Sequence, residues 1–62
     1  MDDFKVEING LDYALTNGVH YWWLIVDDDG GDVFRTAILP EDAPQVRKLA
    51  EKLIEVCNAI ER

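Results

Sequence analysis

The chain has 62 residues, a net charge of −7 and a single cysteine. One domain, residues 1–62, accounts for this length, and one cysteine with one histidine excludes an internal disulfide and a four-ligand zinc site. The 13 acidic residues against 6 basic ones disfavour direct binding to nucleic acid or to an anionic membrane, because both need Lys and Arg.

Alternating apolar and polar residues predict the first two strands, over about residues 3–9 and 11–16. The Asn9-Gly10 pair between them is typical of a two-residue type I′ hairpin, since both turn positions need a positive φ. This turn sets Ile8 opposite Leu11. Turn and pattern agree on the register, because six apolar side chains then lie on one face: Phe4, Val6, Ile8, Leu11, Tyr13 and Leu15.

A second Asn-Gly pair, Asn17-Gly18, predicts another tight turn and a third strand over about residues 19–27. The same arithmetic sets Leu15 opposite His20. This strand is apolar on both of its faces, which is typical of a central strand that is covered twice.

The acidic segment 27–32 predicts a turn that leads into a fourth strand over about residues 32–39. If Asp29-Gly30 forms its centre, Val26 pairs with Val33. A one-residue bulge among the glycines would exchange the two faces of this last strand, so its register stays open at this point.

The last third of the chain predicts one helix over about residues 43–61. Pro40 ends the preceding strand, Asp42 is a good N-cap, and Gln45 occupies the capping-box position. The predicted fold is α+β: an antiparallel three- to four-stranded β-meander followed by one C-terminal α-helix packed on one face. The apolar stripe of the helix consists of Val46, Leu49, Ala50, Leu53, Ile54, Cys57 and Ile60.

One helix covers only one face of a sheet, and the sheet is predicted to have two apolar faces. The uncovered face is expected to bind a macromolecule, because Tyr and Trp are enriched at interaction sites, while carboxylates beside it favour a basic protein partner. The alternatives are that the twisted edge strands cover this face, or that it is buried in a homodimer. The predicted partner-binding residues are Val19, Tyr21, Trp23, Ile25, Phe34 and Ile38, flanked by Asp27, Asp28, Asp29 and Asp32.

Catalytic groups are not recognisable. The chain has no serine, and His20 and Cys57 lack a third group to orient them, so neither is assigned to catalysis. Cys57 is expected to be a buried, inert thiol on the helix stripe. The segment 27–32 departs from the EF-hand template, and a cation-binding module built on it is the least favoured alternative. We therefore expect no enzyme, no cofactor and no bound metal.

In length, acidity and element order the chain resembles small phage-encoded inhibitors, such as anti-CRISPR proteins and acidic DNA mimics. That resemblance implies stoichiometric inhibition of a basic, nucleic-acid-binding protein surface. A second resemblance, carried by Asp28-Asp29-Gly30-Gly31 and the helix from Asp42, is to HicB-type antitoxins. It implies an antitoxin-like small protein, and the alternative function is therefore a homodimeric structural or antitoxin-like small protein.

The expected location is the cytoplasm, or the host cytoplasm if a phage encodes the chain. Met1-Asp2-Asp3 is acidic where a targeting segment is basic and then apolar. The longest apolar run, residues 21–26, is too short to cross a bilayer. A lone cysteine is typical of a reducing compartment.

Overall fold

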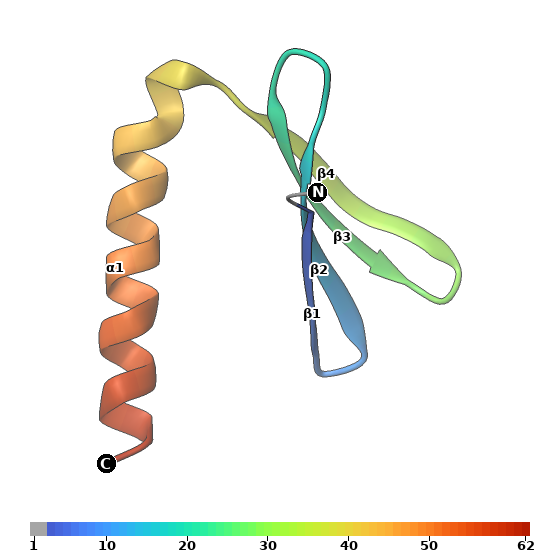
Figure 1. The fold of residues 1–62 in the computed structure, drawn as a ribbon. Coiled ribbons are helices and arrows are strands. Elements are labelled where there is room, and N and C mark those ends of the chain that lie inside the picture. Colours follow the sequence, from blue (N-terminus) through green and yellow to red (C-terminus); the bar gives the residue numbers. More distant parts are fainter. Residues whose placement is uncertain (1–2) are drawn as a thin grey trace.

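The computed structural model describes residues 3–62, so Met1 and Asp2 of the acidic N-terminus lie outside the described residues. A single sheet has four antiparallel strands in the order β1-β2-β3-β4, and one long helix follows it (Figure 1). This confirms the predicted α+β class in its four-stranded form. The elements are β1 (Phe4–Ile8), β2 (Leu11–Asn17), β3 (Trp22–Asp28), β4 (Gly31–Ile38), the 3₁₀ turn η1 (Pro40–Asp42) and α1 (Ala43–Ile60).

The first hairpin forms as its sequence predicts. Asn9 and Gly10 have φ values of 57° and 83°, the left-handed conformation that a type I′ turn requires. Ile8 pairs with Leu11, and Phe4 pairs with Leu15. The apolar residues of β1 and β2 therefore share one face.

The predicted tight turn at Asn17-Gly18 is wrong. A loop over residues 18–21 joins the strands instead, closed by a hydrogen bond of 2.9 Å from the Gly18 N–H to the Tyr21 carbonyl. Leu15 consequently pairs with Leu24 and not with His20, a shift of four positions. Since four is an even number, each side chain of β3 keeps the face that the sequence predicted.

Gly18 has a steric role in this loop and no positive φ. A Cβ at this position would lie 2.8 Å from the Tyr21 carbonyl oxygen and 2.9 Å from the Trp23 ring. The Asn-Gly pair thus reflects a close approach of the backbone to Trp23, which explains why the hairpin rule gave the wrong turn.

The last register also differs from the expectation. An irregularity between Val26 and Asp27 makes Val26 pair with Phe34, whereas Asp28 pairs with Gly31 across the turn. The bulge that the sequence left open is therefore present, and it places Phe34 and Ile38 on the opposite face from the one expected. Gly31, with φ of 125°, supplies the conformation that this turn needs.

The sheet consequently has one strongly apolar face and one mixed face. We call the first the apolar face; the charged residue on its side of β3, Asp28, stands at the turn end of the strand. The second, the mixed face, has Lys5, Asp12, Trp23, Ile25 and Arg35 among its members. The apolar face consists of Phe4, Val6, Ile8, Leu11, Tyr13, Leu15, Trp22, Leu24, Val26, Phe34, Thr36 and Ile38.

The predicted packing of the helix on the sheet is absent. Every residue of α1 is exposed, and Val26, at 8% exposure, is the one buried residue among residues 3–62. Figure 1 shows α1 standing beside the sheet and joined to it through the connector after β4. The contacts that were expected to form the core are therefore not made within one chain.

The connector explains the position of the helix. Asp42 does not act as the predicted N-cap, because its backbone is already helical and its carboxylate turns back to accept a hydrogen bond of 3.3 Å from the Leu39 N–H. The Asp42 N–H donates to the Leu39 carbonyl at 2.8 Å. With Pro40 fixing one more dihedral, these bonds hold η1 in a turn that directs α1 away from the sheet.

Candidate functional site

The uncovered apolar surface of the described residues has two parts. On the apolar face of the sheet, Phe4 and Phe34 are 57% and 53% exposed. On the helix, Leu49 and Ile60 are 61% and 76% exposed. Apolar surface of this extent on one small chain marks an interaction site.

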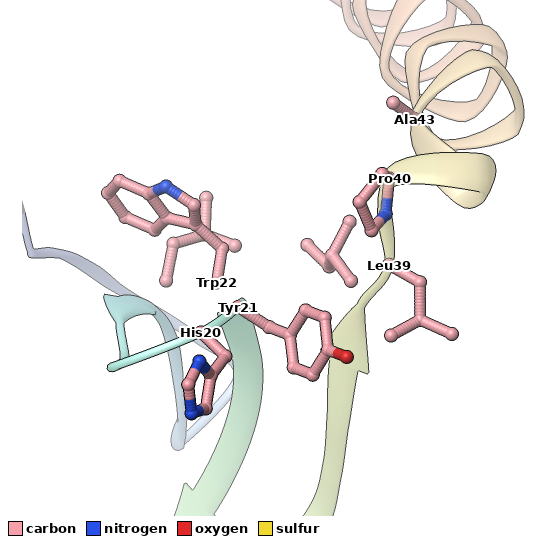
Figure 2. A pocket seen from close by; sticks show the side chains of 8 residues that line it. His20, Tyr21, Trp22, Leu39, Pro40 and Ala43 are labelled. Carbon is pink, nitrogen blue, oxygen red and sulfur yellow. The ribbon is translucent and has the colours of Figure 1, made fainter.

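A hollow of about 540 Å³ lies where the sheet meets the connector. Figure 2 shows Tyr21 and Trp22 on the sheet side and Pro40 and Ala43 on the helix side. Its wall is almost entirely apolar, which favours an apolar side chain as its occupant. The remaining lining residues are Leu15, His20, Ile38 and Leu39.

A second hollow, of about 390 Å³, lies between the apolar face and the first turns of α1. Leu15 and Ile38 line both hollows, so the two form one continuous groove. On the helix side the second hollow reaches Val46 and Leu49. We call this combined surface the sheet–helix groove.

The predicted partner-binding residues do not form one patch. Val19, 93% exposed, and Tyr21 lie in the loop after β2, where Tyr21 reaches the sheet–helix groove. Phe34 and Ile38 lie on the apolar face, and only Trp23 and Ile25 remain on the face where all six were expected. The displaced register and the bulge account for this separation.

Trp23 is partly shielded within its own chain. The Arg35 guanidinium carbon lies 5.7 Å from the centre of the Trp23 ring, a cation–π contact, and the ring is half-buried. On the same face Lys5 pairs with Asp12 at 3.6 Å. The mixed face therefore covers part of its apolar surface with its own charged side chains.

The acidic residues gather at the β3–β4 turn, as predicted. Arg35 lies 3.6 Å from the Asp32 carboxylate, and Asp28 accepts a hydrogen bond of 2.7 Å from the Gly30 N–H. The pKa of Asp27 is raised above 3.8, first by a side-chain hydrogen bond with Asp32, then by desolvation and by the negative charges of Asp32 and Asp12. Arg35 opposes this shift.

Several residues of the sheet–helix groove were not predicted as site residues. Three of these residues belong to the connector: Leu39, Pro40 and Ala43. From the sequence they are predicted only to mark the end of a strand and the start of a helix. Val46 and Leu49 were assigned to the core because they lie on the helix stripe. These residues line a groove only because the connector directs α1 away from the sheet. No local sequence pattern predicts that course of the connector.

The structure offers no support for metal chemistry in this part of the chain. No group of three or more His, Cys, Asp or Glu side chains within residues 3–62 is placed to hold a metal ion. The Asp27–Asp32 segment forms ion-pair and turn contacts instead. Cys57, expected to be buried, is exposed because the helix stripe is uncovered.

Comparison with protein-family models, curated proteins and solved structures finds no match to this chain. No helix within the described residues is long and apolar enough to cross a membrane.

Proposed function

We propose that this chain is a non-catalytic protein-interaction domain. The observation that carries the proposal is the uncovered apolar surface: the helix stripe and, on the apolar face, Phe4, Ile8 and Phe34 are exposed, and Val26 alone among residues 3–62 is buried. Burying such a surface against protein is strongly favourable, whereas leaving it in water is costly. Contact with a binding partner is the simplest way to bury this surface.

The charge of the chain favours a basic protein as an external partner. The net charge of −7 steers encounters with positively charged surfaces and away from nucleic acid. The β3–β4 turn places Asp28, Asp29 and Asp32 on an exposed edge. We propose that the chain acts as a stoichiometric inhibitor, because a basic surface occupied by these carboxylates is no longer free to bind nucleic acid.

Affinity capture from a nuclease-treated lysate of the native host tests this function. We expect a basic protein to be retained, and its release by moderate salt, because screening weakens attraction between opposite charges. Retention of no protein, or binding unaffected by salt, would contradict the proposal. The charge-neutralising variant is Asp28→Asn, Asp29→Asn and Asp32→Asn together, and its matched control is Glu41→Gln, Glu51→Gln and Glu61→Gln.

The exposed thiol of Cys57 fits a reducing compartment, and we accordingly propose a cytoplasmic location. A second candidate function is a homodimeric, antitoxin-like small protein. The observation that favours it is that the helix and the sheet each carry an uncovered apolar surface on the same chain.

A further inference from the structure

The two uncovered surfaces of this chain are complementary. The apolar face offers a sheet four strands wide, and the helix stripe runs along an 18-residue helix. An α-helix packed on a sheet face is a standard two-layer solution for burying both. The helix stripe contains no charged residue; Asp28 at the β3–β4 turn and Asp42 beside the second hollow border such an interface.

The amount of excess surface matches a stable dimer. A folded monomer of 7.1 kDa exposes about 4,100 Å² on average, whereas this chain exposes 5351 Å². The excess is about 1,250 Å² for each chain, or about 2,500 Å² for two, which falls in the range of obligate homodimer interfaces.

The connector argues against coverage by the chain's own helix. The paired hydrogen bonds between Leu39 and Asp42 and the ring of Pro40 fix η1. They hold α1 off the apolar face and leave the sheet–helix groove open between them. A helix from a second chain can enter this groove without any change in the connector.

We propose that two copies exchange their helices, so that α1 of each copy lies on the apolar face of the other. This inference rests on the proposed function, in that the apolar surface is a protein-binding surface, and it names a second copy as the partner. The arrangement is closed and two-fold, because each copy gives and receives one helix. Leu53 and Ile54 then bury against the partner's sheet, and the acidic β3–β4 turns stay exposed.

The oligomeric mass under matched substitutions is the first test. Sedimentation or light scattering should give twice 7.1 kDa for the wild-type chain. Leu53→Glu, in the centre of the stripe, should lower the dimer affinity by more than about a hundredfold, because it places a charge in an apolar interface. Ala59→Glu adds the same charge on the side of the helix opposite the stripe and should leave the mass unchanged.

Mixing two defective variants separates helix exchange from other dimers. Phe34→Glu damages the apolar face but keeps the stripe, and Leu53→Glu damages the stripe but keeps the apolar face. Each alone should be monomeric. Mixed in equal amounts they should form a heterodimer, because the intact helix of one fits the intact sheet of the other. Circular dichroism of each variant checks that its sheet and helix persist.

The dependence on salt distinguishes this proposal from the capture of a basic protein. Two chains of −7 repel each other, so added salt should strengthen the homodimer, whereas it should release a basic partner. A wild-type chain that stays monomeric, or a mixture that fails to form a heterodimer although both variants are folded, would overturn helix exchange. Neither result would change the outcome of the capture experiment, which detects binding of a basic host protein.

Discussion

The aromatic residues on the two faces of the sheet have different surroundings. Trp22 and Trp23 are neighbours in β3 and point to opposite faces, yet Trp23 is covered by Arg35 whereas Trp22 lines an open hollow. An arginine of the same chain shields part of Trp23 on the mixed face, whereas Trp22 on the apolar face is 38% exposed. Adjacent residues of one strand can thus serve stability within a chain and binding between chains.

Val26→Asp is expected to have the largest effect, because it should destabilise the sheet as a whole. Val26 is the one buried residue among residues 3–62, and an unpaired carboxylate there should cost about 4 kcal/mol of unfolding free energy. Chemical denaturation with circular dichroism measures it. Val33→Asp, at a 56% exposed position, is the matched control and should change stability little.

Trp22→Ala and Trp23→Ala test directly whether the two faces of the sheet have different roles. Trp22→Ala should weaken the dimer by about tenfold or more, with a melting temperature that depends on protein concentration. Trp23→Ala should lower stability by about 1–2 kcal/mol at every concentration, since it removes a cation–π contact and partial burial. Equal effects of the two variants on the dimer would contradict the assignment of the faces.

Gly18→Ala probes the loop that sets the register of both faces. The added Cβ would meet the Tyr21 carbonyl oxygen at 2.8 Å and the Trp23 ring at 2.9 Å, so we expect a loss of about 1–2 kcal/mol. Thermal unfolding measures the loss. Gly30→Ala is the control, because its nearest neighbour would lie 3.4 Å away. A fully stable Gly18→Ala variant would mean that the loop closes differently.

Asp27→Asn has the smallest expected effect and concerns pH. A carboxyl whose pKa is raised on folding costs stability at pH values above its unfolded pKa of 3.8, and this cost fades as the pH falls. Asp27→Asn should therefore raise the melting temperature near pH 7 and leave it unchanged below about pH 4. Thermal scans across this range check the sign, and a lower melting temperature at pH 7 would reverse it.

The sequence predicted the elements better than their connections. Asn9-Gly10 and Asn17-Gly18 are the same dipeptide, yet only the first adopts positive φ values, because the second is placed by the contact of Gly18 with Trp23. That contact joins the loop to the strand that follows it, so the dipeptide rule does not contain it. The faces of β3 were still predicted correctly, since the error was an even number of residues.

The prediction of the helix was limited in the same way. Its bounds were predicted to within one residue, because spacing and Pro40 are local signals. Its position was not, since the course of the connector depends on a hydrogen bond from Leu39 to a carboxylate that was expected to cap the helix. The candidate site follows from that course, and so the site was predicted only in part.

The even register shift at the loop over residues 18–21 has a consequence for how this chain can change over time. Insertions or deletions of two residues there slide β3 along β2 and keep every side chain on its face. If the β3–β4 bulge closed with all its residues kept, Val26 would pair with Val33, and Arg35 would instead turn to the apolar face. The first loop can therefore vary by two residues among descendants, whereas β4 can lose its bulge only together with one residue.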